Sequence, residues 1–415
     1  MAEAPLPVSH HEGRPLLAVF SATFFVRFAF GITVAVLYYY ITGQSGGSVQ
    51  QAVGTAGAIA ALSPVGELTT VLFSGAAADR YGRFPVLFSG ISAAALIFVL
   101  LGLTRDPVFL GLANLGYGIA SGAILASSLA IVADASGVTE RGFEMGRFDA
   151  MNLSGWIAGF AFGIGLEASV PNASLGEAFL VGAAILAGAF GFAAFLLRGQ
   201  PVYHGTPGFA MKEVVVAIFR RSVLLVTLPW LVIYMLIGTA LLFFSPAAKG
   251  IGIPPWEFAA IIGCAGLLLV VTQPLFGRFA DRFGRIRMMS VGATGFALVM
   301  VFASLIVAFG PAIPLLVGVG VSIVLALIYG PAALAALTDL SHQVGRATSM
   351  AIYSMTISAG MLVGVFASSQ LYSRWGNPGL YVFFGGLAVG LAALTVARLA
   401  ELRGQGPDRP TIPAR

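Results

Sequence analysis

The chain has 415 residues, of which 58% are hydrophobic and only 9% are Asp, Glu, Lys or Arg. Soluble domains contain about 25% charged residues, so this composition excludes a cytosolic enzyme, and it also excludes a disordered chain. The sequence also argues against an outer-membrane barrel, because the short strands of a barrel alternate polar and apolar residues and do not form long apolar runs. The sequence therefore predicts an all-α membrane protein. Its single cysteine, Cys264, allows no intrachain disulfide.

Apolar runs in the sequence are long enough for twelve spans, since a membrane-spanning helix needs about 20 mostly apolar residues. The predicted spans are 16–41, 52–76, 84–103, 107–133, 149–169, 176–197, 222–244, 257–278, 287–309, 312–338, 347–370 and 378–398.

Lys and Arg are unequally distributed among the segments that connect these spans. If the N-terminus is cytoplasmic, 18 of them fall in cytoplasmic segments, 3 in outer loops and one, Arg27, within a span. Because cytoplasmic loops are enriched in Lys and Arg, both termini are predicted to be cytoplasmic. The net charge of +5 then reflects membrane topology and does not indicate nucleic-acid binding.

The longest polar stretch, 198–221, separates six spans from six. We therefore expect a cytoplasmic tail at 1–15, a helical bundle at 16–197, a linker at 198–221, a second bundle at 222–398 and a cytoplasmic tail at 399–415.

A short motif follows both the second and the eighth span. The pattern G-x-x-x-D-R-x-G-R occupies 75–83 and recurs at 277–285, an offset of 202 residues. Asp134 and Asp339 at the ends of spans 4 and 10 repeat at an offset of 205, as do two glycines of span 5 in span 11. A duplicated six-helix unit of this kind is typical of secondary transporters with a central site between the halves.

The doubled motif resembles the major facilitator superfamily, and the resemblance covers the whole chain. It implies two pseudo-symmetric six-helix bundles that rock between inward-open and outward-open states. It also implies that Asp79 latches the cytoplasmic side closed against the start of span 11, with Arg147 and Arg346 as candidate partners. The residues assigned to this cytoplasmic gate are Gly75, Asp79, Arg80, Gly82, Arg83, Gly277, Asp281, Arg282, Gly284, Arg285, Arg147 and Arg346.

Two ionisable residues lie deep within spans, where charges are unfavourable and usually functional. Arg27 and Glu67 each lie about 11 residues from a cytoplasmic helix end, roughly 16 Å deep at 1.5 Å per residue, so neighbouring helices can pair them. Glu67 is either a protonatable carboxylate coupled to Arg27 and substrate, or half of a permanent structural ion pair. Asp149 is a second candidate for proton coupling, or a first-turn acid favoured by the helix dipole.

Polar and aromatic residues at helical spacing are candidates for a substrate cavity. The family resemblance implies that spans 1, 4, 7 and 10 line it, although aromatic residues also serve in packing and in interfacial belts. The candidates are Tyr38, Asn114, Tyr117, Ser121, Trp230, Tyr234 and Tyr329.

A partial match indicates the drug:proton antiporter branch, whose span 5 carries G-x8-G-x3-G-P-x2-G-G. This chain keeps the first four glycines, but Phe160 replaces the proline and Ile164 the last glycine. The R-x-x-Q-G segment of span 4 in that branch reads Asn114-Leu-Gly-Tyr117-Gly118 here, so its Arg and Gln are missing.

These observations predict a transporter and not an enzyme, because the sequence contains no H-E-x-x-H, G-x-S-x-G or P-loop motif. We expect proton antiport that exports a drug-like or metabolic compound, by a monomer in the cell membrane. Its partners would be a small organic substrate, protons and membrane lipid, with no cofactor, metal or nucleic acid. The alternatives are proton-coupled uptake of an organic anion or nutrient bound by Arg27, an uncoupled facilitator, and a non-transporting membrane sensor.

Overall fold

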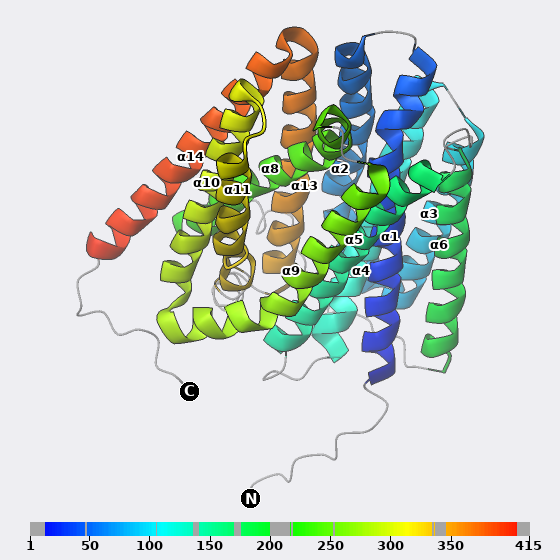
Figure 1. The fold of residues 1–415 in the computed structure, drawn as a ribbon. Coiled ribbons are helices and arrows are strands. Elements are labelled where there is room, and N and C mark those ends of the chain that lie inside the picture. Colours follow the sequence, from blue (N-terminus) through cyan, green and yellow to red (C-terminus); the bar gives the residue numbers. More distant parts are fainter. Residues whose placement is uncertain are drawn as a thin grey trace, which may run out of the picture. The chain divides into compact units, whose positions relative to one another are not determined.

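The computed structural model describes residues 13–45, 48–104, 106–135, 141–169, 176–199, 216, 219–251, 254–333, 336 and 346–404, and within them every regular element is a helix (Figure 1). The helices are α1 (Gly13–Ser45), α2 (Val49–Tyr81), α3 (Arg83–Leu103), α4 (Pro107–Ala135), α5 (Arg141–Ser169), α6 (Gly176–Leu197), α8 (Arg221–Ile251), α9 (Pro255–Phe283), α10 (Arg285–Phe309), α11 (Ile313–Ala326), α13 (Arg346–Trp375) and α14 (Asn377–Gly404).

The chain forms two compact units. The first consists of residues 1–213 and 241–270, and the second of residues 214–240 and 271–415. Helices α8 and α9 therefore each contribute residues to both units. This grouping does not decide where the two halves of the repeat begin, so their division at 198–221 remains a prediction.

The chain is a multi-pass helical membrane protein. In its described part, nine helices are long and apolar enough to cross a membrane, or ten if α2, which bends by 48°, counts as one span. Each predicted span overlaps a helix of the structure. The apolar parts of α5 and α9 are shorter, however, at Ala150–Leu166 and Ala259–Gln273. The full count of twelve spans therefore remains a prediction.

The tenth predicted span, 312–338, is not one continuous helix. Helix α11 ends at Ala326, a turn occupies Leu327 and Ile328, and helical residues resume at Tyr329. Pro331 explains the interruption, because it has no amide hydrogen to donate to the carbonyl of Leu327 and its ring crowds the preceding turn.

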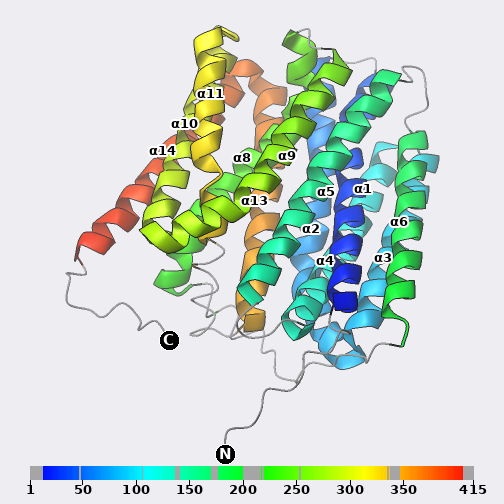
Figure 2. The same ribbon diagram turned by 60° about the horizontal axis from the view of Figure 1, so that its bottom comes forward.

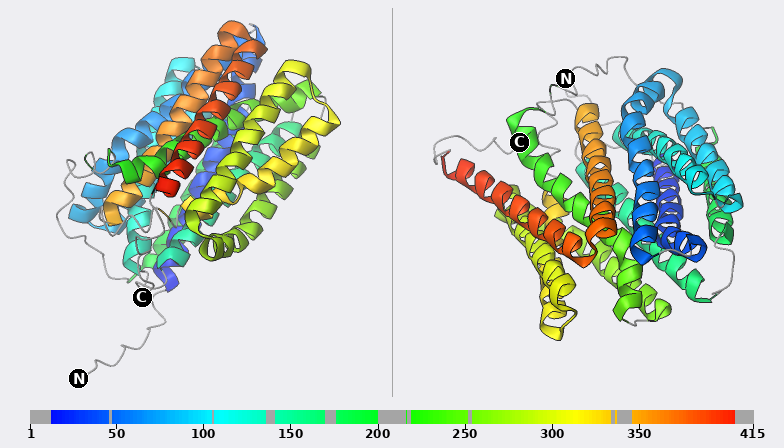
Figure 3. Two further views of the ribbon diagram at one scale, coloured as in Figure 1. Left: turned by 90° about the vertical axis from the view of Figure 1, so that its left-hand side faces the viewer. Right: turned by 90° about the horizontal axis from the view of Figure 1, so that it is seen from above.

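Helix α1 is central to the first unit, since it packs against α2, α4, α5 and α6 (Figure 2). Helix α4 in turn packs against α2 and α3. In the second unit, α10 packs against α11 and α14, and α14 also contacts α13 (Figure 3).

The repeated motif makes the same tight connection in both halves. Gly82 between α2 and α3 has φ of 99°, and Gly284 between α9 and α10 has φ of 92°. Only glycine adopts such angles without strain. The two amides donate to the carbonyls of Ala78 and Ala280, each at 3.1 Å.

Candidate functional site

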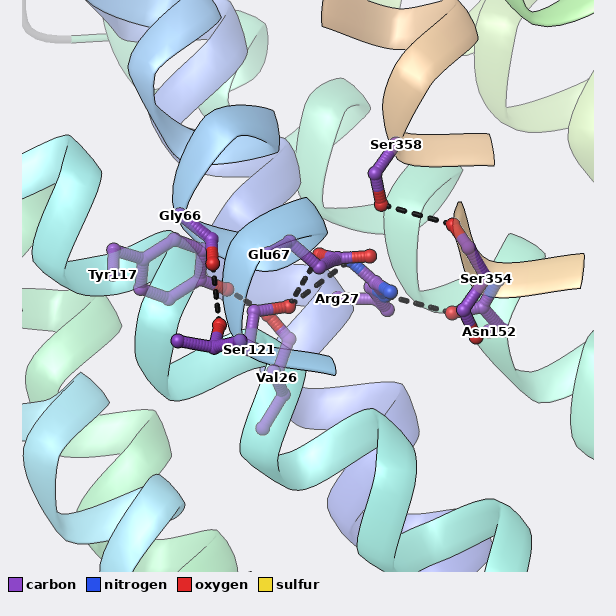
Figure 4. Close-up of polar contacts among 10 residues, drawn as sticks. Val26, Arg27, Gly66, Glu67, Tyr117, Ser121, Asn152, Ser354 and Ser358 are labelled. Atoms are coloured by element: carbon purple, nitrogen blue, oxygen red, sulfur yellow. Dashed lines mark hydrogen bonds and ion pairs between the residues drawn. The ribbon is translucent and has the colours of Figure 1, made fainter. Parts of the chain in front are cut away.

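A cluster of charged and polar side chains lies inside the first unit, around Arg27 on α1 (Figure 4). Arg27 and Glu67 are only 8% and 6% exposed, and Arg27 Nη1 lies 3.4 Å from Glu67 Oε2. Arg27 Nε donates a shorter hydrogen bond of 2.7 Å to Oδ1 of Asn152 on α5. The structure thus brings together the two ionisable residues that the sequence placed at one depth.

Ser121 on α4 connects the two charges. Its hydroxyl donates to Glu67 Oε2 at 2.8 Å and accepts from Arg27 Nη1 at 3.3 Å. Charge-assisted N–H···O bonds are usually about 2.7–2.9 Å long, so the direct contact between Arg27 and Glu67 is long. One guanidinium therefore contacts a carboxylate, a hydroxyl and an amide from three different helices.

Glycines on α5 explain why Asn152 reaches Arg27. A Cβ on Gly155 would lie 2.3 Å from the carbonyl oxygen of Phe24, and one on Gly159 would lie 1.9 Å from that of Phe28. Any larger residue would therefore force α5 away from α1. Small residues at such spacing are the usual means of close helix contact in membranes.

Glycines also bring α4 against α2, where Glu67 lies. A Cβ on Gly118 would meet the carbonyl oxygen of Ser63 at 1.9 Å, and one on Gly66 would meet that of Leu115 at 2.3 Å. With the two backbones this close, the short side chain of Ser121 spans the distance to the Glu67 carboxylate.

The other candidates on α4 are engaged within the first unit. Tyr117 donates from its hydroxyl to the carbonyl of Val26 at 2.9 Å, stacks on Phe30 and meets Phe98 edge-on. Asn114 is buried and donates to Leu110 O at 3.0 Å. Tyr117 therefore fixes α4 to α1 one residue before Arg27, whereas contact of these two residues with a substrate remains a prediction.

Arg83 ties three helix ends together at the predicted cytoplasmic side. Its Nη1 pairs with Asp79 Oδ1 at the end of α2, and its Nε donates at 3.0 Å to Oδ2 of Asp134 at the end of α4. Sequence reasoning missed Asp134 as a member of the gate, although its repeat in Asp339 was a usable signal. Asp79 thus has a partner inside its own motif.

The remaining gate residues lie as follows. Arg147 donates to Glu144 at 3.0 Å and its guanidinium lies over the ring of Phe20. Arg80 and Arg282 lie over the rings of the residues that follow them, at 5.4 and 5.6 Å, so this contact is repeated in both halves. Gly75 and Gly277 are helical, and Arg285 begins α10. Four predicted site residues have side chains outside the described part of the structure: Tyr38, Asp149, Asp281 and Arg346.

Aromatic side chains form a second cluster, in the second unit. Trp230 stacks on Tyr234 at 6.4 Å and meets Tyr329 and Tyr353 edge-on at 6.0 and 5.1 Å. The Tyr329 hydroxyl donates to the carbonyl of Val226 at 3.4 Å. Tyr353, which starts the third turn of α13, was missed because a lone tyrosine there gave no periodic pattern.

The glycine contacts relate the two halves residue by residue. Gly364 approaches the carbonyl of Met235 on α8 as Gly159 approaches that of Phe28 on α1. This aligns α8 with α1 at an offset of 207 residues and α13 with α5 at 205. The motif offset of 202 and the Asp134 offset of 205 extend the alignment to α9 and α11. The residues at the positions of Arg27, Glu67, Ser121 and Asn152 in the second half are then Tyr234, Leu269, Ala326 and Ile357. The charged cluster is therefore absent from the corresponding positions of the second half.

Comparison with known proteins gives consistent results. A family model described as Major Facilitator Superfamily matches residues 19–275 and 247–414. Multidrug resistance protein 2 of Bacillus subtilis (strain 168) is 24% identical over 296 residues, which cover 68% of this chain and 71% of that protein.

Two solved structures share the fold. The human organic anion transporter MFSD10 (TETRAN) has a TM-score of 0.70 at 17% identity, covering 94% of this chain and 100% of its own. A mutant of the nucleoside transporter NupG has a TM-score of 0.63 at 15% identity, covering 93% and 99% of the two chains.

Proposed function

Because this chain belongs to the major facilitator superfamily, it is a secondary transporter and not an enzyme, and we propose that it exports a small organic compound in exchange for protons. In this proposal Glu67 is the group that gains and loses the proton. The compound is drug-like or metabolic, and the protein has twelve spans with both termini in the cytoplasm. The similarity to Multidrug resistance protein 2 supports export of such a compound.

The hydrogen bond from Arg27 to Asn152 is the observation that carries the proposal. A permanent structural ion pair in a buried site requires close geometry to offset the desolvation of both charges. Here Arg27 makes its shorter bond, 2.7 Å, to a neutral amide and its longer contact, 3.4 Å, to Glu67. Glu67 can therefore take up a proton while Arg27 keeps a hydrogen-bonding partner.

Ser121 fits the same role, because a hydroxyl both donates and accepts. It donates to the Glu67 carboxylate in the present arrangement. After protonation the carboxylic acid becomes a donor and the hydroxyl rotates to accept from it. The cluster then keeps its hydrogen bonds in both protonation states, as a reversible proton site must.

In this proposal the two halves of the protein have different functions. The residues aligned with the charged cluster are apolar or aromatic in the second half, where the rings around Trp230 lie instead. We assign proton coupling to the first half and contact with the apolar part of the substrate to Trp230, Tyr234 and Tyr329. Asp149 would be a second proton site near the predicted cytoplasmic mouth.

Alternating access requires a gate whose two states have similar free energy. We assign this gate to the repeated motif together with Asp134, because Asp79, Arg83 and Asp134 hold the ends of α2, α3 and α4 together. In the outward-facing state the predicted latch from Asp79 to Arg147 or Arg346 would form, and its formation would compete with the pairing of Asp79 with Arg83.

Purified protein in sealed liposomes tests this function. An imposed proton gradient should drive uphill movement of fluorescent lipophilic compounds in wild type, and Glu67→Gln should abolish it. Glu177→Gln, the same change at an exposed first-turn position of α6, is the matched control and should leave the flux unchanged. Proton-driven flux that survives in Glu67→Gln would show that the Arg27–Glu67 pair is structural.

The same measurement separates the alternatives. Co-movement of protons and compound would indicate uptake of an organic anion or nutrient, with Arg27 as the anion site. Flux that is indifferent to the gradient would indicate a facilitator, and a sensor would show no flux while still binding a compound.

A further inference from the structure

Among the residues that the structure describes in the first unit, two buried hydroxyl groups have no hydrogen-bonding partner. They belong to Thr23 on α1 and Ser128 on α4, which are 4% and 0% exposed. The oxygen of each is inaccessible and makes no hydrogen bond to protein. Buried polar groups in native proteins are bonded to protein or to ordered water in the large majority of cases, so an orphaned hydroxyl indicates a water site.

Neighbouring hydroxyls on the same two helices behave differently. Ser127 donates to the carbonyl of Ala123 at 2.6 Å, and Thr33 donates to that of Ala29 at 3.2 Å. This bond to the preceding turn is the usual one for serine and threonine in a helix. In its described part the structure leaves Thr23 and Ser128 outside this pattern, so neither hydroxyl is satisfied by a carbonyl of its own helix.

Both hydroxyls lie on the faces that carry the charged cluster. Thr23 precedes Arg27 by four residues, one helical turn, and Ser128 follows Ser121 by seven residues, two turns. Helix α1 packs against α4, and at 1.5 Å per residue the two positions lie roughly 6 and 10 Å from the cluster along their helices. Both are displaced toward the start of α1 and the end of α4.

Asp134 lies beyond them in the same direction. It follows Ser128 by six residues, roughly 9 Å along α4. Its side chain is 32% exposed and accepts from Arg83. Measured along the helix axes, the two orphaned hydroxyls therefore lie at heights between that of a buried carboxylate, Glu67, and that of a carboxylate in contact with solvent, Asp134.

We infer that Thr23 and Ser128 hold ordered waters that connect Glu67 with Asp134, and that this line conducts the proton between Glu67 and the predicted cytoplasmic face. Each hydroxyl and water accepts one proton on one side and gives up one on the other, so all of them end unchanged. Glu67 loses the proton that solvent at Asp134 receives. The proton path rests on the proposed function of Glu67. The presence of ordered waters at Thr23 and Ser128 does not depend on that function.

Several charged and polar groups lie near the Glu67 carboxylate and influence a proton that binds there. Arg27 approaches from α1 and Ser121 from α4. The Tyr117 hydroxyl on α4 lies within electrostatic range of both Arg27 and Glu67, and is bonded to the Val26 carbonyl.

Infrared difference spectra after a rapid pH jump test the proton path in the purified full-length protein. The band that Glu67→Gln removes reports the protonated carboxyl group, and its rate of appearance reports proton delivery. Thr23→Val combined with Ser128→Ala should slow that rate about tenfold, the effect of one lost hydrogen bond at the barrier. Thr33→Val combined with Ser127→Ala is the matched control and should not change it, and Thr23→Ser should retain the wild-type rate.

Equal rates in the double variant and in wild type would overturn the path while leaving Glu67 as a proton site. Absence of the band from wild type at every pH would instead remove the proposed function, and the proton path with it.

Thermal unfolding tests the waters independently of proton transport. If the two hydroxyls are dry, Thr23→Val and Ser128→Ala each remove an unsatisfied polar group, and the Tm rises. If they hold water, the substitutions forfeit its hydrogen bonds and the Tm does not rise. A higher Tm in both single variants would therefore overturn the inference even where proton delivery is slowed.

Discussion

Replacing Gly159 by alanine tests whether the close packing of α5 on α1 holds the charged cluster together. A Cβ there would lie 1.9 Å from the carbonyl oxygen of Phe28, whereas real Cβ atoms essentially never approach within 3.0 Å. The helices would have to separate by about 1.1 Å, because a backbone carbonyl within a helix cannot rotate aside. If that displacement reaches Asn152, its distance from Arg27 Nε grows from 2.7 Å to about 3.8 Å, beyond hydrogen-bonding range.

Two effects then add in the free energy of unfolding. Overpacking of a tight contact costs about 1–3 kcal/mol, and a buried donor that loses its partner costs about 1–3 kcal/mol. We expect Gly159→Ala to lower the unfolding free energy by about 2–6 kcal/mol, measured by denaturant unfolding in detergent micelles. Proton-driven flux in liposomes should fall in parallel, since Arg27 would then rely on Glu67 and Ser121.

Gly165→Ala on the same helix is the control, because a Cβ there would meet none of the described residues within 4 Å beyond the neighbouring backbone of its own helix. Alanine there should stabilise the helix by up to about 1 kcal/mol. Equal stability and equal flux in the two variants would refute the reasoning, since α5 would then adjust to the added methyl group without moving the cluster.

Three further changes have defined outcomes. Gly82→Ala forces a non-glycine residue to φ of 99° and should lower the unfolding free energy by about 1–2 kcal/mol, whereas Gly75→Ala, at an unhindered helical position, should not. Trp230→Ala should cost about 3–5 kcal/mol because the ring is buried among three tyrosines, and Trp256→Ala, at an exposed position, should cost little in the same unfolding measurement. Arg83→Lys keeps the positive charge but lacks the planar guanidinium that contacts two carboxylates. This substitution should therefore change the rate of flux in liposomes. An unchanged rate would show that the contacts between these helix ends do not limit transport.

Helix identity and membrane insertion follow from the sequence, because an apolar run of about 20 residues can satisfy its backbone in lipid only by forming a helix. Each predicted span accordingly overlaps a helix. The repeat could also be recognised from the sequence, because the same motif occurs twice. Its glycines Gly82 and Gly284 lie at positive φ, which glycine adopts without strain. The break before Tyr329 was the main local feature that the sequence interpretation missed, although Pro331 signals it.

Depth in the membrane was enough to pair Arg27 with Glu67, since rise per residue converts sequence position into height. It was not enough to choose the other partners. Asn152 and Ser121 reach the pair only because glycines on α4 and α5 let specific backbones approach. Helical periodicity states which face a residue lies on, but it does not state which other helix covers that face.

The tertiary structure alone therefore decided that the partners of Arg27 come from three other helices. It also decided that, among the described residues, the hydroxyls of Thr23 and Ser128 are left without partners. Whether a serine bonds to its own helix or to a water depends on its rotamer, and the rotamer depends on neighbours that packing supplies. Composition and spacing determine that this chain is a repeated helical membrane protein. The hydrogen-bond partners of its buried polar groups are determined by side-chain packing between helices that are distant in sequence.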